Sequence, residues 1–122
     1  MSDELVTKAE DVARHAYARY SNYHVGAVVR AKDGREFAGV NVENAAYPLG
    51  ICAEKTAIAA AATAGYRPGE IDAIGITASP CGGCRQWLHE FRIGEVSYRA
   101  EDGEIRTTTC AELLPDCWNL PG

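Results

Sequence analysis

The chain has 122 residues and a formal net charge of -5. This length suits one domain with a hydrophobic core, so we expect a single domain over residues 1–122. The acidic balance, without any run of Lys and Arg, argues against a polynucleotide as the main partner, because phosphate contacts need clustered basic groups. No apolar run approaches the roughly 20 residues of a membrane span, and the acidic start lacks a hydrophobic signal region. We therefore expect a cytoplasmic protein with no membrane partner.

The cysteine content favours metal binding over disulfides. Five cysteines are an odd number, so one chain cannot pair all of them. Reduced thiols that serve a metal suit a reducing compartment better. The three histidines, His15, His24 and His89, have no ligand spacing, and we expect packing or solvent contact for each.

The N-terminal part predicts an amphipathic helix. Apolar residues recur at helical spacing over residues 2–18, and charged residues lie between them. We expect Tyr17, near the end of this helix, to pack in the core.

A hairpin follows the first helix. Residues 25–30 and 36–40 have the pattern of two strands, and Asp33-Gly34 between them is a strong hairpin-turn signal. Residues 41–50 contain proline and glycine and are expected to form a loop.

The centre of the chain predicts a buried helix and a buried strand. Residues 52–64 are rich in alanine and apolar nearly all round, and Gly65 is the natural stop of this helix. Residues 71–78 form an apolar, β-branched run typical of a central strand. Pro80 can open the next helix, which should run to about Phe91.

Two more strands, over residues 95–99 and 104–108, are predicted to be joined at Asp102-Gly103. A short helical segment then holds Leu113 and Leu114. Strands that alternate with helices favour an α/β fold in which helices cover a sheet.

The chemistry is concentrated in Cys52-Ala53-Glu54 and in the motif Cys81-x-x-Cys84. Cys81 and Cys84 are three apart, so on a helix they share one face and can bind one ion, and Cys52 would add a third thiolate from a separate helix. Catalytic zinc sites keep three protein ligands and leave a position for water, whereas structural sites close with four. Glu54 is poorly placed as a ligand beside Cys52, because helix residues two apart point in different directions, but it could lean towards a water on the metal.

Two alternatives stay open for these residues. A Cys-x-x-Cys motif alone also occurs in redox sites, which predict a reactive cysteine at a helix start and need neither Cys52 nor Glu54. A structural zinc site needs a fourth ligand, which Cys110 or Cys117 could supply. The catalytic interpretation uses Cys52 and Glu54 together and leaves Cys110 and Cys117 as small buried residues, and we prefer it.

The motifs resemble the cytidine deaminase family, in its small homotetrameric branch. The resemblance covers nearly the whole chain in the same order, and the combination is highly specific. The stretches that carry it are Cys52-Ala53-Glu54, Pro80-Cys81-Gly82-Gly83-Cys84-Arg85-Gln86, Gly39-Val40-Asn41-Val42-Glu43-Asn44-Ala45-Ala46-Tyr47 and Leu113-Leu114-Pro115. It implies a three-layer α/β fold, with a mixed five-stranded sheet flanked by helices, and a homotetramer with sites at subunit interfaces.

The implied activity is zinc-dependent hydrolytic deamination of cytidine and 2′-deoxycytidine to uridine and 2′-deoxyuridine, with release of ammonia, as in pyrimidine salvage. Cys52, Cys81 and Cys84 would hold Zn²⁺. Glu54 would take a proton from the attacking water and pass it to the pyrimidine. Three thiolates make a negatively charged zinc centre, which helix N-termini at Cys52 and Cys81 would offset.

The resemblance also implies the nucleoside contacts. Asn41 and Glu43 match the pair that hydrogen-bonds the ribose hydroxyls, although loop capping is the alternative for such residues. Tyr23 matches an aromatic residue beside the nucleoside, Tyr47 a residue that reaches a neighbouring subunit's site, and Trp118 an aromatic residue that covers the base across an interface. Core packing is the alternative for these three aromatic residues.

Two departures from the family pattern bear on the site. Lys55 stands where the family usually has an arginine whose planar fork is hydrogen-bonded to the thiolates, and lysine cannot make that fork. A solvated surface lysine is the alternative for Lys55. The segment Thr77-Ala78-Ser79 leads directly to Pro80, where the family has several more residues, so the mouth of the site or an interface would differ.

Three rival functions remain. One is a deaminase of a modified cytosine nucleoside, as in the blasticidin S deaminases, although Asn41-Val42-Glu43-Asn44 favours a plain ribose. The second is a polynucleotide deaminase, which the acidic balance disfavours. The third is a non-catalytic structural zinc module.

Overall fold

The computed structural model of the chain describes residues 2–120. In this range five strands form one sheet: β1 (Gly26–Ala31), β2 (Glu36–Val40), β3 (Ile71–Ile76), β4 (Glu95–Arg99) and β5 (Ile105–Thr108). The α-helices are α1 (Asp3–Val12), α2 (Ala53–Thr63), α3 (Gly82–Glu90) and α4 (Cys110–Leu113), and two 3₁₀ turns cover Ala13–His15 and Tyr47–Leu49.

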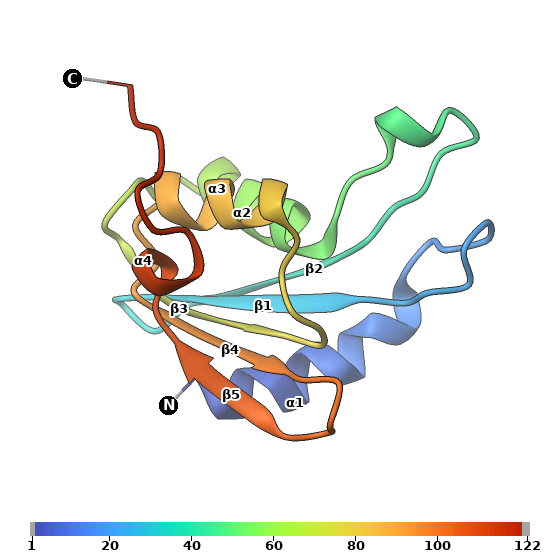
Figure 1. Cartoon of the computed structure of the whole chain (residues 1–122), viewed down its shortest axis with the longest axis horizontal. Coiled ribbons are helices and arrows are strands. Elements are labelled where there is room, and N and C mark those ends of the chain that lie inside the picture. The colour runs from blue at the N-terminus through green and yellow to red at the C-terminus, as the bar shows by residue number, and fades with distance from the viewer. Residues whose placement is uncertain (1, 121–122) are drawn as a thin grey trace.

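The sheet is mixed and has the strand order β2-β1-β3-β4-β5. β1 pairs antiparallel with both β2 and β3, β3 pairs parallel with β4, and β4 pairs antiparallel with β5. Helix α1 lies on one face of the sheet, and α2 and α3 lie side by side on the other (Figure 1). The predicted three-layer α/β fold with a mixed five-stranded sheet is confirmed.

The core has one part on each face of the sheet. β3 is buried at every position except its second, as expected for a central strand covered on both sides. Between the sheet and the pair α2 and α3, Ile58 and three alanines of α2 (Ala53, Ala57 and Ala61) pack on the strands. On the opposite face, Leu5 and Ala9 of α1 pack on Val28 and Ala73.

Three strand glycines let helices approach the sheet closely, and at Gly26 of β1 a Cβ would lie 2.2 Å from the carbonyl oxygen of Ala9 in α1. A Cβ on Gly39 of β2 would lie 2.3 Å from the backbone nitrogen of Ala57 in α2. A Cβ on Gly75 of β3 would lie 2.4 Å from the carbonyl carbon of Leu5 and 2.5 Å from the nitrogen of Val6 in α1. All these distances are below any real contact of a Cβ atom, so each position excludes a side chain.

The first helix is shorter than predicted. It ends at Val12, a 3₁₀ turn follows, and the chain is irregular from Ala16 to the start of β1. The prediction that Tyr17 packs in the core is wrong, because its side chain is 49% exposed. Its backbone N–H donates to the carbonyl of Asn41 (3.0 Å), and its carbonyl accepts from the N–H of Glu43 (2.9 Å). This pairing ties residue 17 to the loop after β2 instead of to the sheet.

The start of α3 also differs from the prediction. β3 ends at Ile76, and α3 begins at Gly82 with Cys81 as its N-cap residue. Pro80 therefore precedes the helix and does not open it, and Cys81 lies just outside the helical turn that contains Cys84. The expected turn at Asp33-Gly34 and the expected stop at Gly65 are confirmed, with positive φ values of 94° and 104° at the two glycines.

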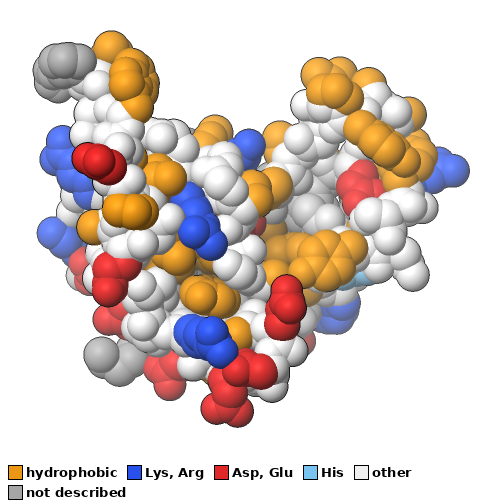
Figure 2. All heavy atoms as spheres, viewed as in Figure 1, with side chains coloured by type: hydrophobic (Ala, Val, Ile, Leu, Met, Phe, Trp, Pro, Cys, Tyr) orange, Lys and Arg blue, Asp and Glu red, His pale blue; other side chains and the backbone are white. Residues whose placement is uncertain are grey.

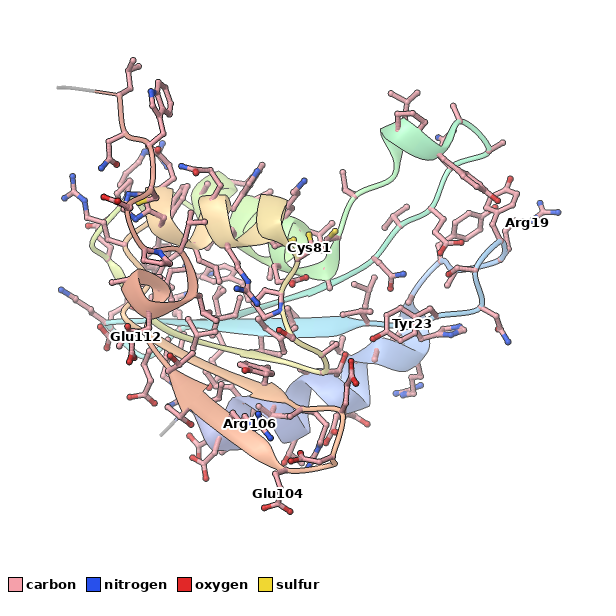
Figure 3. All side chains as sticks on the ribbon, in the orientation of Figure 1. Arg19, Tyr23, Cys81, Glu104, Arg106 and Glu112 are labelled. Atoms are coloured by element: carbon pink, nitrogen blue, oxygen red, sulfur yellow. The ribbon has the colours of Figure 1, made fainter. Side chains whose placement is uncertain are left out.

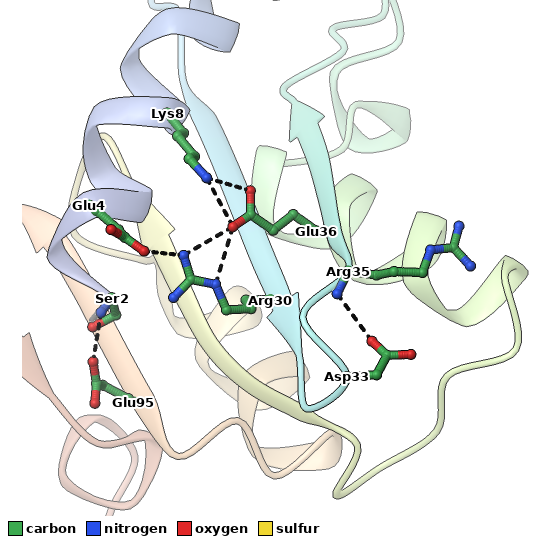
Figure 4. A network of polar contacts seen from close by, with 8 residues as sticks. All are labelled: Ser2, Glu4, Lys8, Arg30, Asp33, Arg35, Glu36 and Glu95. Carbon is green, nitrogen blue, oxygen red and sulfur yellow. Dashed lines mark hydrogen bonds and ion pairs between the residues drawn. The ribbon is translucent and has the colours of Figure 1, made fainter.

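A polar network fastens α1 to the edge of the sheet (Figure 4). Arg30 of β1 forms ion pairs with Glu4 of α1 and, at 3.0 Å, with Glu36 of β2. Lys8 of α1 completes the network, with its Nζ 2.8 Å from Glu36. The hydrogen bond from Lys8, assisted by Arg30, holds the pKa of Glu36 below its ordinary value.

No helix within residues 2–120 is long and apolar enough to cross a membrane.

The close approach of α1 to β3 can be tested at Gly75. Gly75→Ala is expected to lower the free energy of unfolding by about 3 kcal/mol, because the new Cβ meets backbone atoms that cannot move aside. Gly94→Ala is the matched control, because its Cβ would point into open space. Chemical denaturation of both variants measures the difference, and equal stability would contradict the close contact.

Candidate active site

Three thiols meet where α2 and α3 begin. The sulfur atoms of Cys52, Cys81 and Cys84 all lie within 4.8 Å of one another. Cys52 is the N-cap residue of α2, Cys81 is the N-cap residue of α3, and Cys84 is buried in the first turn of α3. Among residues 2–120, no other group of three or more Cys, His, Asp or Glu side chains is arranged to hold a metal ion.

The thiol cluster fits a zinc ion. Sulfurs bound to one tetrahedral zinc at ~2.3 Å lie roughly 3.8 Å apart, so the observed cluster needs only small movements to hold one ion. Two of the three residues cap helices, and a helix N-terminus favours a thiolate over a thiol. Three soft sulfur donors and no hard oxygen donor in the set also select zinc over magnesium or calcium.

The thiols differ in their proton affinity when no cation is present. Burial raises the pKa of Cys52, and burial together with the charge of Glu54 raises the pKa of Cys84 more strongly. Burial acts in the same direction on Cys81, but hydrogen bonds from the Cys84 backbone and the neighbouring thiols hold the pKa of Cys81 below its ordinary value. A cation is therefore needed to make all three thiolates at once.

Glu54 is a buried carboxyl group beside the cluster. Its residue is only 4% exposed, and it lies in the first turn of α2. Burial raises the pKa of Glu54, while its own backbone N–H, the Cys84 thiol and the charge of Lys55 act in the opposite direction. Glu54 is not part of the group of thiols that could share one ion. It is thus placed to hold a proton near the cluster without joining it.

A cavity of about 290 Å³ opens beside the thiols. Cys52, Glu54 and Cys81 line one side of it, and Tyr23, Asn41 and Glu43 line another. Figure 2 shows the corresponding hollow between the body of the molecule and the protruding chain after β2, and Figure 3 labels Tyr23 and Cys81. Apolar residues form most of the remaining wall of the cavity. A small, partly apolar molecule that carries a few polar groups fits such a cavity.

Asn41 and Glu43 are both hydrogen-bonded to the segment that carries Tyr23. The Asn41 amide accepts from the N–H of Val25 (2.9 Å) and donates to the carbonyl of Tyr23 (2.8 Å). Glu43 accepts from the N–H of Tyr20 (2.9 Å) and from the N–H (3.0 Å) and hydroxyl of Ser21.

The loop-capping alternative is therefore part of what these two residues do. The hydrogen bonds of Ser21 lower the pKa of Glu43, which keeps it ionised. A carboxylate offers about four acceptor positions, so Glu43, with three donors, retains room for one further donor such as a hydroxyl.

Tyr47 and Trp118 lie outside this cavity. Tyr47 is 74% exposed and lines a neighbouring hollow of about 240 Å³, which shares Glu43 and Gly50 with the first. Trp118 is 70% exposed and lies beside Trp87 on the outer side of α3. Core packing, the alternative for these aromatic residues and for Tyr23, is excluded within a single chain because each is exposed.

Lys55 is half-buried over the first turn of α3. Its Nζ lies 3.6 Å from the position that a Cβ of Gly83 would occupy. Lys55 therefore neither lines the cavity nor extends freely into solvent. Because residue 83 has no side chain, the ammonium can come close to the turn that contains Cys84.

The remaining thiols take no part in the cluster. Cys110 and Cys117 are half-buried, so the expectation that they are buried is wrong. Cys117 Sγ lies 3.0 Å from His89 Nε2, which is also 2.7 Å from Asn119 Oδ1. A fourth thiolate from Cys110 or Cys117 is therefore excluded for this arrangement.

The sequence pattern did not single out two serines of the site. Ser79 lines the cavity, and Ser21 links Glu43 to the N–H of Tyr23 through its hydroxyl. Ser79 stands directly before Pro80 in the cysteine motif, which could have indicated it. The bond from Ser21 to Glu43 spans 22 residues of chain, and no local pattern reveals such a contact.

Residues 1–100 match the family model for the cytidine and deoxycytidylate deaminase zinc-binding region. The chain belongs to this family. A cytidine deaminase from Sporosarcina psychrophila is 36% identical over 125 residues, which cover 96% of this chain and 90% of that protein. One from Mycobacterium tuberculosis H37Rv is 38% identical over 116 residues, with 92% and 85% coverage.

Crystal structures agree with this membership. The cytidine deaminase from Burkholderia pseudomallei is 42% identical and superposes with a TM-score of 0.90, covering 97% of this chain and 99% of that chain. The matched region of the family is a zinc-binding one, and the three clustered thiols supply the donors for it. This member of the deaminase family is thus a zinc enzyme.

Removal of one clustered thiol tests which residues hold the metal. Cys84→Ala is expected to reduce bound zinc to a small fraction of the wild-type content, because it deletes one of three donors. Cys110→Ala, which removes a half-buried thiol outside the cluster, is expected to keep stoichiometric zinc. Elemental analysis after dialysis measures both, and full zinc in Cys84→Ala would contradict the assignment.

Proposed function

We propose that this chain hydrolyses cytidine and 2′-deoxycytidine to uridine and 2′-deoxyuridine, with release of ammonia, as one catalytic domain. One observation carries the proposal: a buried carboxyl group, Glu54, stands beside three clustered thiols in a cavity that also presents Asn41 and Glu43. A hydrolytic deaminase needs these elements, namely a metal, a proton carrier and polar groups for a sugar.

Cys52, Cys81 and Cys84 would hold the zinc ion and leave one position open. A zinc ion bound there would act as a Lewis acid, which makes water a competent nucleophile near neutral pH. Glu54 takes one proton from the attacking water as the oxygen bonds to the amine-bearing ring carbon, and it delivers this proton to the adjacent ring nitrogen. The C–N bond then breaks, and Glu54 transfers the second proton of the water to the departing amine, which leaves as ammonia.

The environment of Glu54 suits this exchange. A group that both accepts and returns protons works best when its pKa lies near the working pH. Burial moves the pKa of Glu54 upward from the ordinary range of a carboxyl group.

Asn41 and Glu43 would bind the sugar hydroxyls. Glu43 stays ionised and keeps one acceptor position beyond its three contacts with Tyr20 and Ser21. Tyr23 would form a wall beside the nucleoside, since it is 61% exposed and lines the same cavity.

A homotetramer would complete the site, and its setting would be pyrimidine salvage in the cytoplasm. The tetramer is supported by apolar residues that are exposed on the chain after β2 and near the C-terminus: Val42, Tyr47, Leu49, Ile51, Trp118 and Leu120. Figure 2 shows apolar side chains gathered at the tips of the two parts that protrude from the molecule, the chain after β2 and the C-terminal segment. Exposed apolar patches of this kind mark interaction surfaces. Tyr47 and Trp118 would reach the site of a neighbouring subunit.

The direct test is ammonia release from four substrates by zinc-loaded protein. We expect turnover of cytidine and 2′-deoxycytidine and none of adenosine or blasticidin S. Turnover of blasticidin S alone would mean that the short segment before Pro80 has redirected the pocket to a modified nucleoside. If folded, zinc-loaded protein releases no ammonia from any of the four substrates, the result would favour a structural zinc module.

Glu54→Gln tests the proton carrier. The amide keeps the size of the side chain but cannot accept and return a proton, so we expect zinc to be retained and turnover to fall by about 10²- to 10⁴-fold or more. Parallel zinc analysis and single-turnover assays measure the two effects. Loss of zinc together with activity, or wild-type turnover, would overturn the role assigned to Glu54.

A further inference from the structure

The segment between β3 and α3 has few contacts of its own. It carries Ser79, which lines the cavity, and Pro80, and it ends at Cys81, the exposed N-cap thiol of the cluster. Within residues 2–120, no backbone hydrogen bond involves the N–H or carbonyl of residues 78 and 79. A short irregular stretch without backbone bonds has several torsions free to vary, and the direction from which the chain enters Cys81 depends on them.

One side chain supplies the hydrogen bonds that residues 79 and 80 of this segment receive. The Arg85 Nε–H donates to the carbonyl of Pro80 at 2.9 Å, and its Nη2 donates to the hydroxyl of Ser79 at 3.3 Å. Arg85 lies in α3, one residue after Cys84. The guanidinium therefore reaches back over the N-terminus of its own helix and ties the two residues before Cys81 to the helix that carries Cys84.

The guanidinium has a third, more distant anchor. Its Nη1 donates to the carbonyl of Leu113, the last residue of α4, at 3.0 Å. Arg85 is half-buried, so this bond is partly shielded from water. Because each of its three nitrogens donates a hydrogen bond, the plane of the guanidinium is fixed by residues before and after it in the chain.

We propose that Arg85 is a positioning residue for the metal site, which sets the place of the Cys81 thiol and of the Ser79 hydroxyl. It does not line the cavity, and it acts through the carbonyl of Pro80. The proposal rests on the proposed function only in that Cys81 is a zinc ligand. Metal ligands must lie within about 0.5 Å of the productive geometry. The carbonyl of Cys81 is bonded to α3 by the backbone N–H of Arg85 (2.9 Å), and the two residues before Cys81 are tied to the same helix by the Arg85 guanidinium.

Lysine cannot replace arginine in this role. Its ammonium is a single point of charge on a flexible stem, whereas the three acceptors of Arg85 lie in different directions around a rigid fork. We expect Arg85→Lys to recover little of the effect and Arg85→Gln none.

The test compares Arg85→Gln and Arg85→Lys with Arg67→Gln. Arg67 is a matched control, because its Nη1 donates to the carbonyls of Ala62 (2.9 Å) and Tyr66 (3.0 Å) at the far end of α2. Zinc affinity is measured by competition with a chromophoric chelator, and the visible absorption of the Co²⁺-loaded proteins reports the thiolate geometry. Thermal unfolding of the metal-free proteins separates a loss of fold from a loss of positioning.

We expect zinc affinity to fall by about 10- to 100-fold in Arg85→Gln, as when other residues that orient metal ligands are removed. The Co²⁺ spectrum should change, while Arg67→Gln keeps the wild-type affinity and spectrum. Affinity within twofold of wild type in Arg85→Gln, with an unchanged spectrum, would overturn the proposal. An equal loss in Arg67→Gln would overturn it as well.

The wild-type protein separates this inference from the proposed function. Wild-type protein that binds zinc tightly but releases no ammonia would contradict the function and leave the role of Arg85 open to the same measurement. If Arg85→Gln does not fold, Ser79→Ala and Arg85→Lys still test the segment, and unchanged affinity and spectra in both would contradict its positioning by Arg85.

Discussion

The site depends on two helix starts that meet at one edge of the sheet. β2 and β3 both run antiparallel to β1, so they point in the same direction and their carboxyl ends lie at the same edge. The chain leaves β2 towards α2 and leaves β3 towards α3, and both helices pack on the same face. The N-cap residues Cys52 and Cys81 are therefore brought together by the strand order, although 29 positions separate them in the numbering.

Close packing turns this approximate meeting into a cluster. Gly39 lets the backbone of α2 lie directly on β2, since even a methyl group there would overlap Ala57. The alanines on the inner side of α2 keep the helix near the sheet along its length. On the other face, Gly75 allows the same close contact with α1. The positions of the helices on the sheet thus depend on backbone contacts that permit only glycine.

Much of this architecture could be predicted from the sequence, and the reasons are local. Alternating apolar patterns and the turn at Asp33-Gly34 define the strands, and the alanine-rich run defines α2. The three cysteines and Glu54 stand out by residue type and spacing. Tyr17 was predicted wrongly because its place depends on a distant partner: its backbone pairs with the loop after β2. The contact of Arg85 with Leu113 spans 28 residues and has no signature in spacing.

The same limit applies to the polar residues of the cavity. Asn41 and Glu43 could be singled out by resemblance, but their bonds to the segment around Tyr23 could not. These bonds mean that the groups proposed to bind the sugar also build the wall that faces it. A substitution at either position would therefore move Tyr23 as well as remove a contact, and its effect on KM would exceed that of one hydrogen bond.

Charge balance explains why the cluster sits at helix starts. Three thiolates exceed the charge of one zinc ion by a single negative charge, and Glu54 adds another when ionised. Each helix N-terminus carries about half a positive charge, so the starts of α2 and α3 together offset roughly the excess on the metal. Lys55, whose Nζ lies over Gly83 at the first turn of α3, faces the same region with a full charge. With the charge of the metal centre offset in this way, burial is the main influence on the proton of Glu54 and raises its pKa, as a proton carrier requires.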